Sequence, residues 1–206
     1  MQRYGNASNS GAVQTAIRLK VAIPAIDAKE TDVMRFQSRK RRPTTDGVLG
    51  RLLARLSVLA GGKPPTVWEI DENRMAGAAG YQVIHPDQDT KRDYQSIYDA
   101  SGCTGLLDQW IQRCSRGAEI VLAGFYSNRI NFAFPHAFMR EMKFRISAEW
   151  SADDMTVINA MIDEGILSLD GLVTHRAKAS DAKLAYVQAF EDPTCYKMVL
   201  DWEAIH

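Results

Sequence analysis

The chain has 206 residues, of which 46% are hydrophobic and 24% are charged, as in ordinary globular proteins. Twenty-five basic side chains balance twenty-five acidic ones, which argues against a protein coated in basic charge for binding nucleic acid. No uncharged apolar run approaches the roughly 18–20 residues of a membrane span, and the three cysteines have no metal-type spacing. We therefore expect a cytoplasmic protein without a membrane span, a metal site or a nucleic-acid partner.

The neutral total hides an uneven distribution of charge. Residues 1–46 hold nine basic and four acidic side chains, a net charge of +5, so residues 47–206 carry −5. The basic run 39–42 marks the border, and we interpret it as a solvated loop because no aromatic platform or recognition helix accompanies it. The sequence thus predicts an irregular basic segment over 1–46, in which only 16–26 has enough apolar residues for a short strand or helix.

From residue 47 onward, helical and strand-like runs alternate, with glycines at the joints. The expected helices are 47–59, 71–79, 104–114 and 152–164. The expected strands are 66–70, 81–85, 96–100, 119–124 and 143–150. Alternation at this spacing is typical of an α/β fold with a parallel sheet and flanking crossover helices. We predict one Rossmann-like domain over 47–206 that ends in a C-terminal return segment.

The first clear helix begins with part of a dinucleotide-binding pattern. Gly47 and Gly50 take the second and third glycine positions, and Thr45 stands at the first. The backbone N–H groups of this helix start are suited to a pyrophosphate. Glu69 follows Gly50 by nineteen residues, where an acidic side chain can accept hydrogen bonds from both ribose hydroxyls of NAD and repel the extra phosphate of NADP. The competing interpretation is an ordinary helix start and a solvated strand end.

Two further strand ends belong to the same candidate site. In a wound sheet, ligands bind outside the carboxyl ends of the strands, where Asp99, Ser101, Gly102 and Gly124 are expected to lie. Taken alone, these residues are also typical of ordinary turns.

Longer stretches of residues 47–206 resemble the medium-chain dehydrogenase superfamily. The matching stretches are 47–56, 66–69, 85–87, 92–94, 119–126, 132–135, 137–141, 167–176 and 197–202. Within the superfamily they are most similar to the enzymes of bacteriochlorophyll biosynthesis that oxidise the hydroxyethyl group of a bacteriochlorophyllide to acetyl. The resemblance implies that NAD is the cofactor, that a magnesium tetrapyrrole is the substrate, and that the protein can pair as a homodimer.

The resemblance also implies a role for each matched position. Gly47, Val48, Leu49 and Gly50 would hold the pyrophosphate of NAD, Glu69 would bind the adenosine ribose, and 99–102 with Gly124 would frame the rest of the cofactor. Apolar surface for the pigment would come from Phe125, Tyr126 and Phe134.

The N-terminal part departs from this family. Only 46 residues precede Gly47, they do not resemble the family's substrate domain, and 38–46 stands where the first strand of the sheet belongs. We therefore expect a truncated chain whose first strand is missing or replaced, with neighbouring strands left open and no identifiable catalytic base. The alternative function is a non-catalytic nucleotide-binding remnant of such an enzyme. His85 and His175 are interpreted as surface or hydrogen-bonding residues.

Overall fold

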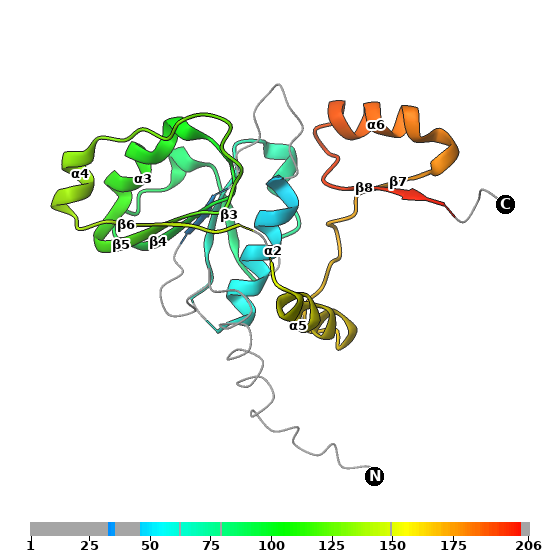
Figure 1. Cartoon of the computed structure of the whole chain (residues 1–206), viewed down its shortest axis with the longest axis horizontal. Coiled ribbons are helices and arrows are strands. Elements are labelled where there is room, and N and C mark those ends of the chain that lie inside the picture. Colours follow the sequence, from blue (N-terminus) through cyan, green and yellow to red (C-terminus); the bar gives the residue numbers. More distant parts are fainter. Residues whose placement is uncertain (1–32, 36–45, 62, 79, 149, 203–206) are drawn as a thin grey trace, which may run out of the picture.

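The computed structural model describes residues 33–35, 46–61, 63–78, 80–148 and 150–202 (Figure 1). Six parallel strands form one sheet in the order β3-β2-β1-β4-β5-β6. Their bounds are β1 Val33–Arg35, β2 Thr66–Trp68, β3 Gln82–Ile84, β4 Tyr94–Asp99, β5 Cys114–Leu122 and β6 Lys143–Ile146. The predicted parallel α/β sheet is confirmed, with β5 longer and β6 shorter than expected.

The first strand was expected to be missing or replaced, and β1 shows that it is not missing. It runs parallel to β2 on one side and to β4 on the other, with Val33 opposite Thr66 and Ile97. The two neighbouring strands are therefore not left facing a gap. The sequence obscured β1 because it is only three residues long, inside a segment dominated by charged and polar residues. Residues 16–26 and 38–45, including the basic run, lie outside the described residues.

The helices are α2 Asp46–Leu59, α3 Leu107–Arg113, α4 Phe134–Met139, α5 Ala152–Asp163 and α6 Ala182–Glu191. Short 3-10 turns form at η1 Glu72–Arg74, η2 Pro86–Gln88, η3 Thr104–Leu106 and η4 Ala179–Asp181. The expected helix over 71–79 is wrong. Only η1 forms there, capped by Asp71, and Gly77 and Gly80 then take positive φ angles that end any helical path. Within the described parts of the chain, no helix is long and apolar enough to cross a membrane.

Successive residues of the central strands point to opposite faces of the sheet. One face packs against α2 and α5, through Val67, Tyr98 and Val121. The other packs against α3 and α4, through Trp68, Ile97 and Ile120. Helices therefore cover both faces, and the core is divided into two layers by the sheet.

A buried polar cluster around Asp89 secures the loop between β3 and β4. Its Oδ2 accepts hydrogen bonds from Trp68 Nε1 at 2.6 Å and from the Tyr94 hydroxyl at 2.5 Å. The Arg113 guanidinium lies 3.7 Å from the same oxygen and donates to the backbone oxygens of Asp89 and Pro86. This loop, which the sequence marks only as charged, is therefore part of the packed structure.

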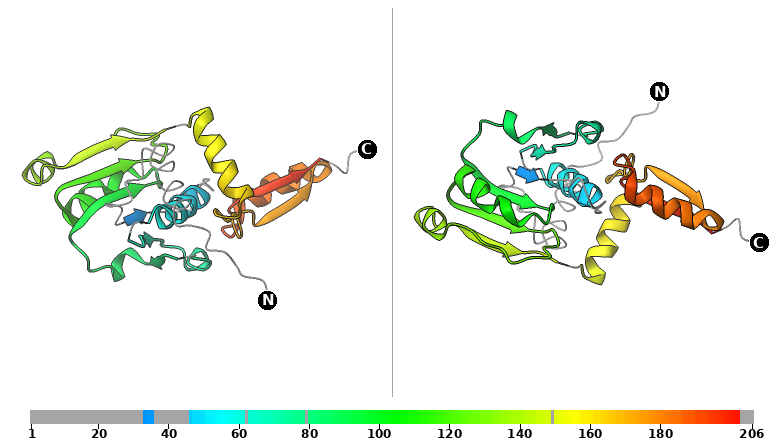
Figure 2. Two further views of the ribbon diagram at one scale, coloured as in Figure 1. Left: turned by 90° about the horizontal axis from the view of Figure 1, so that it is seen from below. Right: turned by 90° about the horizontal axis from the view of Figure 1, so that it is seen from above.

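The last part of the chain forms a separate unit that we call the C-terminal module, made of β7 His175–Lys178, η4, α6 and β8 Met198–Asp201. Strands β7 and β8 pair in parallel as a second sheet. The module lies on the far side of α2 from the large sheet, and the two views of Figure 2 agree with Figure 1 on this placement. The sequence pattern did not predict its helix or strands.

Candidate functional site

The carboxyl end of β2 and the start of α2 meet at a small pocket. Glu69 and Gly47 both line it. The other residues around it are Arg51, Val67, Arg74, Tyr81, Val83 and Tyr196. The first turn of a helix leaves its backbone N–H groups without helical partners, so this pocket combines N–H donors with a carboxylate acceptor.

Glu69 is held in a fixed orientation by its own loop. Its side chain is buried, and Oε1 accepts hydrogen bonds from the backbone N–H groups of Ile70 at 2.8 Å and Asp71 at 3.0 Å. Burial raises the pKa of the Glu69 carboxyl, while these two hydrogen bonds and the positive charge of Arg74 oppose the rise. The loop thus presents a preoriented, partly desolvated carboxylate beside the helix start.

Tyr196 covers the start of α2 from the C-terminal module. A Cβ added to Gly47 would stand 2.7 Å from Cδ1 and 2.9 Å from Cε1 of the Tyr196 ring. Arg51 Nη2 donates to the Tyr196 hydroxyl at 2.6 Å and also to the backbone oxygens of Arg74 and Ala76. Gly47 therefore has to be a glycine for this ring to lie where it does.

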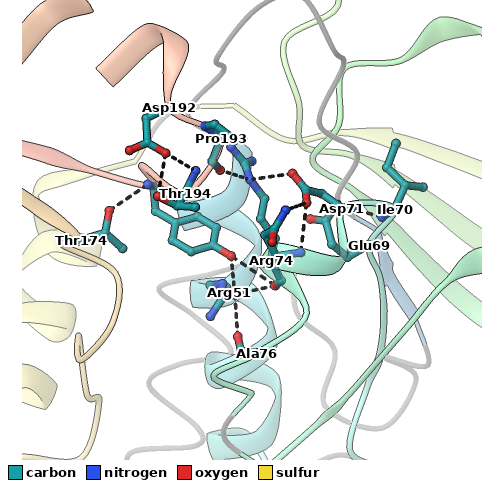
Figure 3. Close-up of polar contacts among 12 residues, drawn as sticks. Arg51, Glu69, Ile70, Asp71, Arg74, Ala76, Thr174, Asp192, Pro193 and Thr194 are labelled. Atoms are coloured by element: carbon teal, nitrogen blue, oxygen red, sulfur yellow. Dashed lines mark hydrogen bonds and ion pairs between the residues drawn. The ribbon is translucent and has the colours of Figure 1, made fainter. Parts of the chain in front are cut away.

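Arg74 ties the same pocket to the C-terminal module. Its Nε donates to the backbone oxygen of Pro193 at 2.7 Å, and it lies 3.9 Å from the carboxylate of Asp71 (Figure 3). The guanidinium carbons of Arg51 and Arg74 stand 4.3 and 5.3 Å from the centroid of the Tyr196 ring. Figure 3 shows Arg74 between the Glu69 loop and the Pro193 segment, with Arg51 close to Ala76.

The polar groups of the pocket suit a dinucleotide, but the free volume is too small to hold one. A preoriented carboxylate next to a helix start is the donor and acceptor set that a ribose and a pyrophosphate require. The free volume is only about 10 Å³, which is room for about one water molecule. A ribose therefore fits only if a side chain moves.

The remaining residues of the predicted pyrophosphate turn lie in the first turns of α2. Gly50 is buried, Val48 is half-buried, and Leu49 is exposed. Gly47 alone of these four lines the Glu69 pocket. The structure thus brings Gly47 and Glu69 together and leaves the side chain of Leu49 directed away from the core.

The ends of β4 and β5 meet through two glycines. Gly102 has φ +64°, and a Cβ there would run into the backbone oxygen of Phe125. A Cβ on Gly124 would lie 2.6 Å from the backbone nitrogen of Gly102. The predicted residues Gly102 and Gly124 are therefore in direct contact, and each needs to be glycine for the two loops to approach.

Asp99 organises the same edge of the sheet. It is fully buried, and its backbone oxygen accepts hydrogen bonds from Ala123 at 2.8 Å and Gly124 at 2.9 Å. Its carboxylate accepts from the backbone N–H of Ser101 at 3.0 Å and from the Tyr126 hydroxyl. Asp99 and Ser101 thus shape the turn beside Gly124, and their functional role stays a prediction.

The three aromatic residues that were assigned to pigment binding do not lie together. Phe125 is 90% exposed beside Gly102, and Tyr126 is engaged by Asp99. Phe134 begins α4, where it lines a groove of about 530 Å³ with Phe138 and Phe144, and α4 leads into the amino end of β6. Phe134 therefore sits away from the carboxyl edge of the sheet that carries Phe125.

The histidines and cysteines have local contacts. His85 Nδ1 accepts from the backbone N–H of Asp87 at 3.2 Å, and His175 Nε2 lies 3.3 Å from Asp192. All three cysteines are free thiols, and burial raises the pKa of Cys114 to about 12. Among the residues that the structure describes, no group of His, Cys, Asp and Glu side chains is arranged to hold a metal ion.

The strand order 3-2-1-4-5-6, with helices on both faces and an acidic residue at the end of β2, is the doubly wound fold of dinucleotide-binding domains. Solved dehydrogenases share it. A short chain alcohol dehydrogenase from Escherichia coli CFT073, crystallised with NADH, superposes with a TM-score of 0.72 at 17% identity. The superposition covers 98% of this chain and 62% of that one.

Curated relatives are much more similar in sequence. The chain is 56% identical over 157 residues to the 2-desacetyl-2-hydroxyethyl bacteriochlorophyllide A dehydrogenase of Rhodobacter capsulatus, and 54% identical over 158 residues to that of Cereibacter sphaeroides. These matches cover 76% and 77% of this chain and 50% of each relative, so the chain spans about half of their length. No protein-family model matches. The resemblance drawn from the sequence motifs is confirmed.

Sequence reasoning missed Arg51, Arg74 and Tyr196. The hydroxyl of Tyr196 bonds to residues 145 and 122 positions earlier in the chain. No local periodicity can report a contact across such a distance, and Arg51 resembled any basic residue on the solvated side of a helix. The one available signal was Gly47, a helix-start glycine whose neighbour the sequence did not identify.

Proposed function

We propose that this chain is the cofactor-binding half of an NAD-dependent dehydrogenase that oxidises the hydroxyethyl group of a bacteriochlorophyllide to acetyl. The observation that carries the proposal is the 56% identity, over 157 residues, to a curated dehydrogenase of that name. Oxidation removes a hydride from the carbinol carbon and a proton from its hydroxyl, and a bound nicotinamide supplies the hydride acceptor.

Glu69 favours NAD over NADP. A carboxylate at the end of the second strand accepts hydrogen bonds from two ribose hydroxyls, and it repels a phosphate on the same ribose. The two backbone hydrogen bonds to Oε1 fix the carboxylate in place, and among the hydrogen bonds of the described residues none reaches Oε2. Oε2 is therefore the atom that we assign to the ribose.

The cofactor preference is tested by titrating NADH and NADPH and following nicotinamide fluorescence. Hydrogen bonds to a charged group contribute about 1.5–3 kcal/mol, so Glu69→Gln is expected to weaken NADH binding about tenfold or more. The ratio of the affinity for NADH to the affinity for NADPH should also become smaller. Glu72→Gln, on an exposed side chain of η1, is the matched control. Equal affinity of the unaltered protein for both nucleotides would overturn the assignment of Glu69.

Activity is tested separately, because the chain spans half the length of its curated relatives. NAD and the hydroxyethyl pigment are mixed with the protein, and NADH formation is followed by absorbance. Reduction of NAD supports the dehydrogenase. Nucleotide binding without any NADH formation supports the alternative, a non-catalytic nucleotide-binding remnant.

A further inference from the structure

A side chain from a distant part of the sequence limits the free volume beside Glu69. The Tyr196 ring lies within 3 Å of where a Gly47 side chain would begin, over the start of α2. In a dinucleotide-binding turn, a glycine at this place allows the backbone to approach a pyrophosphate closely. In this structure the same space is taken by a side chain from the C-terminal module.

Hydrogen bonds from two distant parts of the chain hold the ring. The Tyr196 hydroxyl donates to the backbone oxygen of Arg74 at 3.2 Å while it accepts from Arg51 at 2.6 Å. The backbone N–H of Tyr196 donates to Thr174 Oγ1 at 2.9 Å. The bond from Arg51 is charge-assisted, so a ligand displaces the ring by forming charge-assisted bonds of its own, as pyrophosphate oxygens do.

The groups that a displaced ring would leave behind match a pyrophosphate. Arg51 and Arg74 are 8% and 6% exposed, and both guanidinium groups lie against the Tyr196 ring. Removing the ring would uncover the guanidinium groups of Arg51 and Arg74 beside the start of α2. Guanidinium groups and helix N-terminal N–H groups are the donors that phosphate oxygens favour.

We propose that Tyr196 gates the nucleotide site: its ring fills the space over Gly47 beside Glu69, and it moves aside when a dinucleotide binds. The inference rests on the proposed nucleotide-binding function and adds a residue that controls access to it. Tyr196 lies two residues before β8, so its displacement also shifts the segment that joins α6 to β8 within the C-terminal module.

The test is calorimetric titration of NADH into the unaltered protein, Tyr196→Ala and Tyr196→Phe. A closed state lowers apparent affinity by the fraction of molecules that are open. Tyr196→Ala is therefore expected to bind NADH roughly tenfold more tightly than the unaltered protein. Tyr196→Phe keeps the ring but loses the hydroxyl contacts, so it is expected to bind NADH about two- to threefold more tightly. Tyr186→Ala, on the exposed face of α6, is the control and leaves affinity unchanged.

The results distinguish a failure of the Tyr196 gate from a failure of the proposed nucleotide-binding function. If the unaltered protein binds NADH and Tyr196→Ala binds no more tightly, the gate is wrong and the nucleotide site stands. If neither binds, both proposals fall. Binding by Tyr196→Ala alone supports both.

A second measurement needs no substitution, and it covers the case in which Tyr196→Ala does not fold. Hydrogen exchange is followed in a peptide that spans 192–202, with and without NADH. An opening ring breaks the bond from the Tyr196 N–H to Thr174, so nucleotide is expected to speed exchange at that amide. Slower exchange would show that Tyr196 is a fixed wall of the site and would overturn the gate.

Discussion

The large sheet and the C-terminal module bury their apolar side chains to very different degrees. In the sheet region, Trp68, Trp110 and Ile97 are fully buried, whereas in the module Leu184, Tyr186 and Phe190 of α6 are each more than half exposed. Burial of apolar surface is the main stabilising contribution to a fold. The sheet region therefore has a core of its own, and the module depends more on its contacts with α2 and η1.

Polar contacts hold the linker and the module against α2 and η1. The linker before β7 buries Leu167 against the α2 layer, and Arg55 donates to the backbone oxygens of Ser168 at 2.5 Å and Asp170 at 2.7 Å. Arg74 reaches Pro193 in the same way. Substitutions in the sheet should therefore affect the whole unfolding transition, while substitutions at the junction should loosen the module locally.

Asp89→Ala is expected to cause the largest loss in the free energy of unfolding. This change removes the acceptor of Trp68 and Tyr94 and leaves the buried Arg113 guanidinium without its carboxylate. Removal of one partner of a buried ion pair costs about 3–5 kcal/mol, so the free energy of unfolding should fall by that amount in urea denaturation. Asp87→Ala, an exposed carboxylate on the same loop, is the control, and an equal loss in both variants would contradict the role of the cluster.

A smaller loss, of roughly 2 kcal/mol, is expected from Gly102→Ala. The new methyl group would meet the backbone oxygen of Phe125, and the positive φ would strain any residue other than glycine. Gly105→Ala is the matched control, because a Cβ there meets nothing within 4 Å. Thermal unfolding of the two variants measures the difference, and similar midpoints would show that the β4 and β5 loops can separate freely.

Arg55→Ala probes the junction and should have a more local effect. It removes two hydrogen bonds to the linker, each contributing about 1 kcal/mol. Exchange of the amides in 166–173 should accelerate while exchange in β4 and β5 stays unchanged. Lys183→Ala, at an exposed position of α6, should change the exchange rate neither in 166–173 nor in β4 and β5. Faster exchange throughout the sheet in Arg55→Ala would mean that module and sheet unfold as one unit.

The smallest effect is the pH dependence contributed by Glu69. Because burial raises its pKa in the folded chain, the folded state holds the proton more tightly than the unfolded state does. The free energy of unfolding should therefore decrease as pH rises from the usual glutamate range through the raised pKa. Glu69→Gln should remove that contribution, so the difference between the two pH profiles measures it. A profile unchanged by the substitution would contradict the raised pKa.

Much of the fold could be predicted from sequence because the signals were local. The apolar periodicity of α2 and α5 and the β-branched run before Glu69 identify elements without tertiary information. Strand β1 was missed because its three residues are specified by pairing with β2 and β4 on both sides and not by an apolar run of their own. The module was missed because α6 has no apolar stripe that a buried face would require.

The residues of the candidate site differ in the same way in how far the sequence predicts them. Gly47 and Glu69 could be paired in advance because their separation is fixed by one helix and one strand, and the structure brings them into the same pocket. Tyr196 and Arg74 could not, because their contact depends on how the C-terminal module returns to α2. A sequence pattern places residues within a unit more readily than between units.

The pairing of β1 with β2 and β4 also has a consequence for the order in which the protein folds. β1 precedes every other described strand in the chain, yet its partners β2 and β4 are synthesised after it, and β4 is separated from it by the whole of α2, β2 and β3. Pairings between residues distant in sequence are slow to form, because the chain loses entropy before the contact stabilises it. The centre of the sheet is therefore expected to close late, when β2 and β4 are both available to receive β1.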